Sequence, residues 1–160
     1  MAGEKHMPVQ KLKDYLDKNK IRYVTIQHSK AYTSSAVASS AHVKGKNLAK
    51  SVIVKLYGKI TMAVLPSKYR VDLERLRTAS LSSSVELATE DDFTRTFPGC
   101  EEGAMPPFGN LYGVPVYVEK SLTEDEEIAF NACSHSELIQ LSYEDFSRLV
   151  KPAVASFRMQ

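Results

Sequence analysis

The chain of 160 residues contains no tryptophan and only two cysteines, Cys100 and Cys133. Two cysteines are too few for the disulfide framework that holds small secreted domains together. No apolar run is long enough to span a bilayer, and the first residues lack the apolar segment of a signal peptide. We therefore expect a cytoplasmic protein in a reducing compartment.

An excess of charge of one sign is also missing, because the formal net charge is only +2 at pH 7. A dedicated nucleic-acid binder usually carries a stronger basic excess or a clustered basic face. This balance leaves room only for a small, local RNA contact. With 43% hydrophobic and 25% charged residues, the composition is that of a globular protein. A chain of this length is most simply one domain over residues 1–160.

The short motifs of the common catalytic classes are absent as well. No G-x-S-x-G, H-E-x-x-H, P-loop or C-x-x-C pattern occurs, which argues against the usual hydrolases, metalloproteases, nucleotide-binding enzymes and redox enzymes. Cysteine and histidine lack the paired spacing of zinc sites, so we expect neither a metal nor a cofactor. Cys133 precedes Ser134 and His135, which leaves two interpretations: a nucleophile beside a base, or the more common small buried cysteine.

Hydrophobic periodicity predicts a mixed α/β protein, with helices around a mixed sheet because strands and helices do not alternate regularly. Thr89 with Asp92, and Ser142 with Asp145, have the spacing of helix N-caps. Residues 57–59 are expected to turn between two antiparallel strands. The expected helices are 9–19, 35–42, 71–79, 90–96 and 143–150, and the expected strands are 21–28, 51–56, 60–65, 114–119, 128–131 and 136–142.

Residues 99–113 contain four of the seven glycines and two of the seven prolines. This density excludes a helix interior and a paired central strand, so the segment is a loop, which we call the glycine-rich loop. Glycine lets a ligand approach the main chain, while adjacent prolines stiffen the loop. The pattern indicates either a rigid loop that presents main-chain N–H groups to a ligand or a long surface connection.

Two side chains outside the glycine-rich loop attract attention, and each has two interpretations. Lys50 stands at the start of an apolar strand, where its ammonium group could hold an anionic or carbonyl-bearing ligand. Alternatively, its stem lies along the sheet and its charged end reaches water. His135 is either a surface residue or a hydrogen-bond donor and proton carrier at a strand end.

Three segments together resemble the YbaK/ProX family: residues 50–55, the loop 103–110 and residues 130–136. Members of this family resemble the editing insertion of bacterial prolyl-tRNA synthetase and include free-standing aminoacyl-tRNA deacylases. The resemblance extends over residues 23–150 and keeps the order of the motifs. It implies a mixed α+β fold whose mixed sheet is strongly curved, as a partly open barrel surrounded by helices.

The resemblance also implies a trans-editing deacylase that hydrolyses the ester of a mischarged tRNA. Lys50 would contact the substrate near the terminal adenosine, and Gly103 would belong to a loop whose backbone surrounds the ester. No protein nucleophile is needed, because the substrate itself would assist the attack of water. The remaining substrate-binding candidates are Tyr32, Ser51, Ala104, Met105, Pro106, Pro107, Phe108, Gly109 and His135.

The implied partners are the acceptor end of a mischarged tRNA and, as a further candidate, an aminoacyl-tRNA synthetase. The chain is expected to be a monomer or a homodimer. Two other functions stay open at this point. One is a non-catalytic module that binds an amino acid, a nucleotide or a tRNA end, and the other is a thiol enzyme that uses Cys133.

Overall fold

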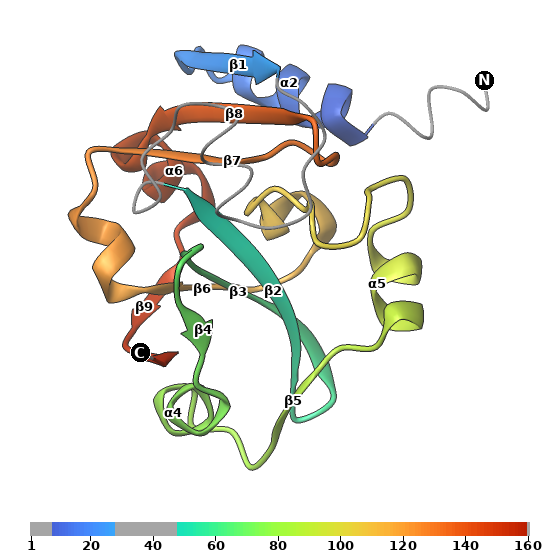
Figure 1. Cartoon of the computed structure of the whole chain (residues 1–160), viewed down its shortest axis with the longest axis vertical. Coiled ribbons are helices and arrows are strands. Elements are labelled where there is room, and N and C mark those ends of the chain that lie inside the picture. The colour runs from blue at the N-terminus through green and yellow to red at the C-terminus, as the bar shows by residue number, and fades with distance from the viewer. Residues whose placement is uncertain (1–7, 28–47, 160) are drawn as a thin grey trace.

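The computed structural model describes residues 8–27 and 48–159 (Figure 1). The expected helix 35–42 and the candidate Tyr32 lie outside these residues. The helices are α2 (Pro8–Lys18), α4 (Leu73–Ala79), α5 (Glu90–Thr96) and α6 (Tyr143–Val150), with two 3₁₀ helices, η2 (Gly109–Tyr112) and η3 (Lys120–Glu124). The strands are β1 (Tyr23–Gln27), β2 (Ala49–Leu56), β3 (Lys59–Pro66), β4 (Arg70–Val71), β5 (Val85–Leu87), β6 (Val116–Glu119), β7 (Glu127–Asn131), β8 (Glu137–Ser142), β9 (Ala153–Ala155) and β10 (Arg158–Met159).

The strands β2 and β3 form the expected antiparallel hairpin, in register from Ala49 opposite Pro66 to Leu56 opposite Lys59. Tyr57 and Gly58 connect them with φ angles of 51° and 80°. Two successive positive φ angles match the right-handed twist of a two-residue hairpin. The predicted turn is therefore confirmed.

The hairpin is the centre of a five-stranded sheet with the order β5-β2-β3-β6-β9. The strand β6 runs parallel to both of its neighbours and is not an edge strand. Pro115 immediately precedes β6, so its missing N–H costs no ladder bond, and its carbonyl accepts a hydrogen bond from the Met62 N–H at 2.9 Å.

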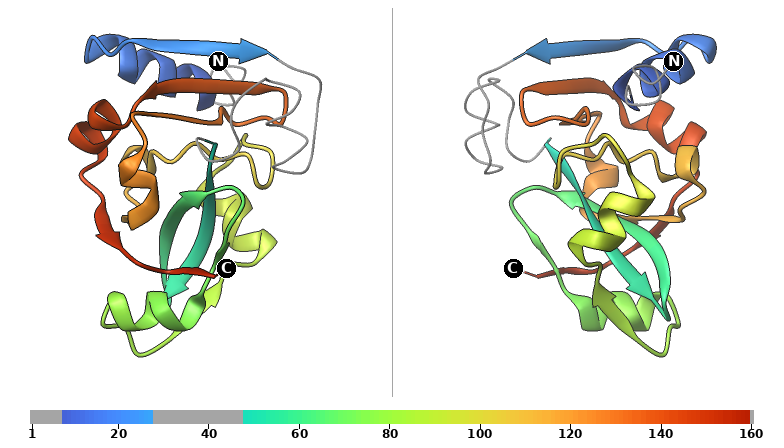
Figure 2. Two further views of the ribbon diagram at one scale, coloured as in Figure 1. Left: turned by 60° about the vertical axis from the view of Figure 1, so that its left-hand side comes forward. Right: turned by 90° about the vertical axis from the view of Figure 1, so that its right-hand side faces the viewer.

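The other strands form a sheet of order β1-β8-β7 and a pair β10-β4. Leu48, which immediately precedes β2, forms an isolated parallel bridge with Ala129 of β7. Figure 2 shows the sheet of β1 and β8 lying above the β2–β3 hairpin. The expected mixed α/β class is confirmed, but its finer description as one strongly curved sheet or partly open barrel is not supported. The described strands divide among three sheets because β7 continues its pairing with β8 instead of extending the β2 ladder.

Local capping explains where three helices begin. The Asp72 side chain accepts a hydrogen bond from the Arg75 N–H at the start of α4. Thr89 and Asp92 form the reciprocal capping box of α5, and the Ser142 hydroxyl caps α6. These contacts satisfy N–H groups that have no partner in the first helical turn.

The two faces of the β2–β3 hairpin bury two different cores. Ile53 and Val64 face the main core, which also contains side chains from α2, α5, α6 and the glycine-rich loop. Val54 and Leu65 face a small core with Leu76 of α4 and Phe157. The glycine-rich loop therefore lies on one defined side of the hairpin. No helix in the described part of the chain is both long and apolar enough to cross a membrane.

Candidate functional site

The glycine-rich loop, residues 99–113, is a loop as predicted, with one short helix, η2, near its end. The helix α2 holds that end in place. Lys11 donates to the Leu111 carbonyl at 3.0 Å, and the Asn110 amide donates to the Tyr15 hydroxyl at 3.1 Å. These contacts join residues almost a hundred positions apart and fix the loop against the body of the protein.

The second half of the loop is buried. Phe108 is fully buried, and its ring packs against Tyr15, Phe130 and Phe146 at centroid distances of 6.3, 5.6 and 5.5 Å. Met105 is 2% exposed and belongs to the same main core. The neighbouring candidates Ala104, Pro106, Pro107 and Gly109 are buried as well. Their burial shows that this half of the loop anchors the chain.

Gly109 is required by packing alone. A Cβ at this position would lie 2.6 Å from the Val114 carbonyl oxygen and 2.8 Å from Val116 Cγ2. Such distances are too short for any side chain. Gly103 differs, because it is exposed and has a φ of +82°, a conformation that L side chains rarely adopt.

The exposed half of the loop pairs with the β7–β8 connection. The Glu101 N–H donates to the Cys133 carbonyl at 2.9 Å, and the Cys133 N–H donates to the Ala104 carbonyl at 2.9 Å. Cys133 itself has a φ of 70°. The structure thus brings together two of the three sequence segments singled out above.

His135 is the side chain that completes this pairing. Its main-chain N–H donates to Glu101 Oε1 at 2.7 Å, and its ring Nε2 lies 2.9 Å from the Glu102 carbonyl oxygen. A carbonyl oxygen only accepts, so Nε2 carries the hydrogen of this bond. Sequence reasoning missed both glutamates, whose position next to Gly103 was the one available signal.

The peptide between Glu102 and Gly103 is therefore held at its carbonyl end. In a trans peptide the N–H points away from the C=O, so the Gly103 N–H is directed away from His135. None of the hydrogen bonds between described residues uses the N–H of Gly103 or of Met105. Gly103 is exposed, so its amide is a donor that a ligand can engage, whereas Met105 is buried in the main core.

Lys50 and Ser51 lie on opposite faces of the hairpin. Residues directly opposite in an antiparallel pair share a face, and Lys50 pairs with Leu65 of the small core. Ser51 pairs with Val64, so its hydroxyl is on the side of the glycine-rich loop. That hydroxyl oxygen is buried and has no hydrogen-bond partner within the described part of the chain.

Lys50 is half-buried beside Arg70. Burial, and to a lesser extent the charge of Arg70, lower the pKa of the Lys50 ammonium group. No hydrogen bond or ion pair between described residues joins Lys50 to the glycine-rich loop. The structure thus brings Gly103 and His135 together and leaves Lys50 at the start of β2, on the other face.

The buried Cys133 thiol is a poor nucleophile. A hydrogen bond with Cys100 and burial raise the pKa of Cys133, so the reactive thiolate is disfavoured at neutral pH. Of the two interpretations of Cys133, the geometry favours the structural one. Among residues 8–27 and 48–159, no group of three or more His, Cys, Asp or Glu side chains could hold a metal ion.

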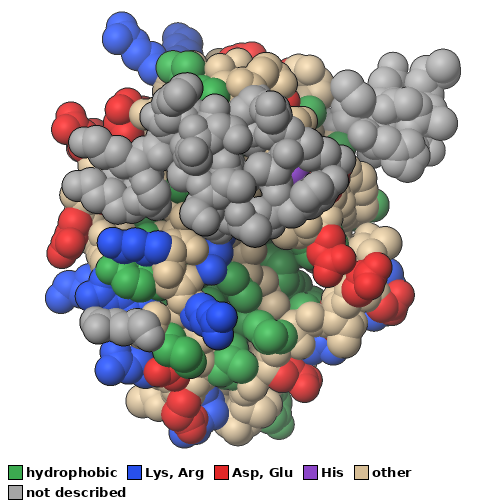
Figure 3. All heavy atoms as spheres, in the orientation of Figure 1, with side chains coloured by type: hydrophobic (Ala, Val, Ile, Leu, Met, Phe, Trp, Pro, Cys, Tyr) green, Lys and Arg blue, Asp and Glu red, His purple; other side chains and the backbone are tan. Residues whose placement is uncertain are grey.

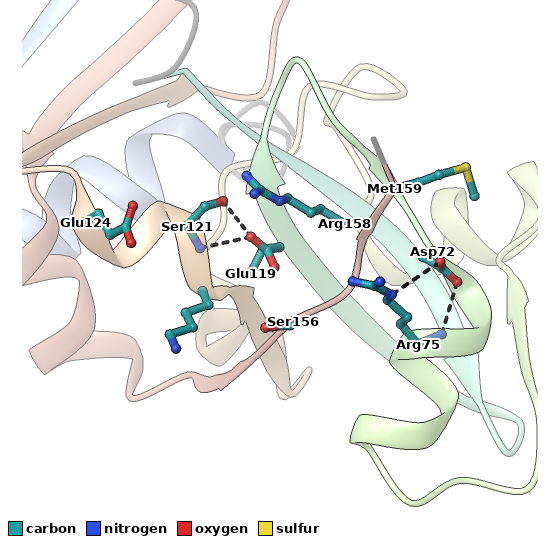
Figure 4. Close-up of a pocket in the computed structure, with 9 residues that line it drawn as sticks. Asp72, Arg75, Glu119, Ser121, Glu124, Ser156, Arg158 and Met159 are labelled. Atoms are coloured by element: carbon teal, nitrogen blue, oxygen red, sulfur yellow. Dashed lines mark hydrogen bonds and ion pairs between the residues drawn. The ribbon is translucent and has the colours of Figure 1, made fainter.

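A separate polar cavity of about 650 Å³ lies between η3, α4 and β10 (Figure 4). Its buried carboxylate, Glu119, already accepts hydrogen bonds from the Ser121 N–H, the Ser121 hydroxyl and the Phe157 N–H. Asp72, on the opposite wall, caps α4 and faces Arg75. None of the residues singled out from the sequence lines this cavity, so we do not assign the functional site to it.

Comparisons with known proteins bear on the family and the fold of this chain. Residues 28–149 match the family model of the aminoacyl-tRNA editing domain. The chain is 27% identical over 149 residues to the prolyl-tRNA editing protein ProX of Acetoanaerobium sticklandii, with 89% of this chain and 90% of that protein covered. It is 31% identical over 121 residues to the multifunctional Ser/Thr-tRNA deacylase ProXp-y of Escherichia coli K12, with 69% and 68% covered.

Solved structures support the fold. A structure determined as a candidate trans-editing enzyme for prolyl tRNA synthetase superposes with a TM-score of 0.82 at 16% identity, covering 96% of this chain and 98% of the other. Identity this low speaks for the fold alone, whereas the family model covers most of the sequence. The chain therefore belongs to the aminoacyl-tRNA editing domain family.

Proposed function

We propose that this protein is a trans-editing aminoacyl-tRNA deacylase, which hydrolyses the ester between a wrong amino acid and the 3′ end of a tRNA. Family membership, the name of one relative as a prolyl-tRNA editing protein and the name of the other as a Ser/Thr-tRNA deacylase support this activity. The observation that carries the proposal is the exposed Gly103 peptide, held in place through the contact between His135 and the Glu102 carbonyl.

The chemistry needs a place for negative charge. When water attacks the ester carbonyl, the carbonyl oxygen becomes an oxyanion, and the bond to the ribose oxygen then breaks to give free amino acid and free tRNA. A fixed N–H donor aimed at that oxygen contributes about 3 kcal/mol to transition-state stabilisation. The exposed Gly103 amide is our candidate donor.

No protein nucleophile takes part in this proposal. The neighbouring ribose hydroxyl of the substrate orients the water, and the ester is already an activated acyl group. In this scheme His135 is a positioning residue, because its Nε2–H is committed to the Glu102 carbonyl.

The other candidates have supporting roles. Lys50 would hold the phosphate of the terminal nucleotide from the start of β2, and the buried Ser51 hydroxyl would face the ester side of the hairpin. Ala104, Met105, Pro106, Pro107, Phe108 and Gly109 would shape the amino-acid pocket by fixing the loop, and Tyr32 stays a candidate for its wall. Pocket size would then select the amino acid, although one methylene changes binding by only about 1–3 kcal/mol.

The whole chain would act as a single editing domain in the cytoplasm, as a monomer or homodimer. Its partner would be the acceptor end of a mischarged tRNA, with a synthetase as a further candidate. The test is release of amino acid from a panel of mischarged tRNAs. We expect at least one substrate and a marked loss with Lys50→Ala. Tight binding of a tRNA end or amino acid without release would instead identify a non-catalytic module.

A further inference from the structure

We propose that Lys68, Arg70 and Arg158, gathered around Tyr69, form a docking surface for the phosphate backbone of the tRNA acceptor stem. We call these four residues the Tyr69 cluster. The inference rests on the proposed function, since it names the surface that carries the body of that substrate while its 3′ end is at Gly103.

The Tyr69 cluster is built by two distant parts of the chain. Lys68 and Tyr69 connect β3 to β4, while Arg158 comes from β10, which pairs with β4 so that Arg158 is opposite Val71. The Arg158 guanidinium carbon lies 4.5 Å from the centroid of the Tyr69 ring, and Lys68 Nζ lies 5.1 Å from it. An aromatic ring holds cations in place without neutralising their charge.

The cations of the Tyr69 cluster lack counter-ions. None of the ion pairs in the described part of the chain involves Lys68, Arg70 or Arg158, and Lys50 has none either. Some other described cations are paired, such as Lys13 with Glu137 and Lys55 with Asp92, each at 2.8 Å. Among the described residues, Lys18 and Lys59 are also without an ion pair, but they lie singly and not around an aromatic ring. Figure 3 shows Lys and Arg side chains gathered over the β4 and β9 region of the surface.

The proximity of Lys50 to Arg70 connects the cluster with the proposed site. Arg70 lies close enough to Lys50 for the like charges to disfavour the ammonium form. A bound phosphate would relieve this repulsion, because an anion near both groups favours their charged forms. Lys50 is our candidate for the terminal phosphate, so the cluster continues the same cationic path along the substrate.

Phosphates fit this surface better than an acidic polypeptide would. Two of the three cluster cations are arginines, whose planar fork matches phosphate oxygens. The Tyr69 ring against Lys68 and Arg158 adds an aromatic face that suits a ribose–phosphate chain. Arg158 lines the same cavity as the carboxylates of Asp72, Glu119 and Glu124, but no ion pair joins it to any of them in the described part of the chain. Asp72 and Glu119 direct their oxygens to the start of α4 and to the Ser121 and Phe157 donors instead.

The test compares two substrates and two charge variants. The cluster variant is Lys68→Gln with Arg70→Gln, both exposed positions, and the matched control is Lys18→Gln with Lys59→Gln, which are exposed and remove the same charge. The substrates are a mischarged tRNA and the aminoacyl ester of adenosine, which lacks the stem. KM, kcat and the salt dependence of KM are measured for each pair.

The cluster variant should raise KM for the mischarged tRNA about tenfold at 0.1 M salt and flatten its salt dependence, because fewer counter-ions are released. It should cleave the adenosine ester at the wild-type rate, and the control should match wild type on both substrates. Equal KM and equal salt slopes for cluster variant and control would overturn the docking surface.

Failure of the proposed function gives a different pattern. If wild type cleaves neither substrate, binding of uncharged tRNA is measured by fluorescence anisotropy for the same variants. Weaker, less salt-dependent binding of the cluster variant alone would still support the surface. Equal binding by all three proteins, or displacement of tRNA by polyglutamate at equal concentration of charge, would contradict it.

Discussion

His135 and Gly103 lie against each other, so that a Cβ built on Gly103 would be 3.7 Å from His135 Cε1. The contact exists because the β7–β8 connection pairs with the glycine-rich loop through two main-chain hydrogen bonds. The imidazole Nε2–H then donates a hydrogen bond to the Glu102 carbonyl, which is part of the same peptide group as the Gly103 N–H. One side chain thus fixes the direction of the proposed oxyanion donor.

Replacing His135 tests this positioning. His135→Ala should lower kcat for deacylation about tenfold, equivalent to about 1.4 kcal/mol, because the freed Glu102–Gly103 peptide no longer holds its N–H on target. KM should change little. His135→Gln, which keeps an N–H donor, should recover part of kcat. An equal loss in the alanine and glutamine variants would assign His135 a different role.

Gly103 and Gly109 should respond differently to alanine. Gly103→Ala makes only an ordinary van der Waals contact with His135 but must adopt a φ of +82°, so we expect a stability cost of about 1 kcal/mol and a clear loss of kcat. Gly109→Ala meets the Val114 carbonyl oxygen at 2.6 Å and should chiefly lower the melting temperature. Thermal unfolding and single-turnover rates, measured on both variants, separate the two effects.

The ion pair between Lys55 and Asp92 predicts an acid-dependent loss of stability. The hydrogen bond from Lys55 lowers the pKa of Asp92 below the ordinary value of 3.8, and the hydrogen bonds from Thr89 lower this pKa further. A lowered folded-state pKa stabilises the protein above the unfolded pKa, and this contribution fades as pH falls through the folded-state pKa.

Asp92→Asn should therefore melt at a lower temperature than wild type at pH 7. The difference should shrink as pH falls from about 5 towards 2. Asp91→Asn, on the exposed side of the same helix, is the control and should have a smaller effect. A deficit of Asp92→Asn that stays constant across this pH range would contradict the account.

Cys133 should behave as a structural thiol. Because the hydrogen bond with Cys100 and burial raise the pKa of Cys133, iodoacetamide at pH 7.5 should modify native Cys133 much more slowly than a free thiol. Mass spectrometry of the digested protein gives the rate, with the urea-unfolded chain as reference. Rapid labelling of Cys133 that abolishes deacylation would instead support a thiol enzyme that uses Cys133.

Local signals made much of the fold predictable. Asp72, Thr89 and Ser142 begin their helices through contacts within three residues, and these appear directly in the sequence. Gly58 and the two apolar runs around it correctly predicted the β2–β3 hairpin. The strands β4, β5, β9 and β10 were missed because they have only two or three residues and are defined by distant partners. Val71, expected in a helix, belongs to β4.

The site was predictable only in part. Sequence order located the glycine-rich loop and the segment of His135, but not the Glu101 and Glu102 contacts that join them. The apolar character of Met105 and Phe108 fits a pocket wall and a core equally well, and tertiary packing places both in the main core. The face on which Lys50 lies depends on the register of the hairpin. A slip of one residue would move every side chain of the strand to the opposite face of the sheet.

The central claim is that the Gly103 N–H stabilises the oxyanion of ester hydrolysis. The most direct measurement replaces that single N–H by an ester oxygen, through ligation at Cys100, and compares single-turnover deacylation of a mischarged tRNA with the wild-type rate. We predict a loss of about a hundredfold with unchanged tRNA binding and melting temperature. A wild-type rate in the folded ester variant would contradict the account.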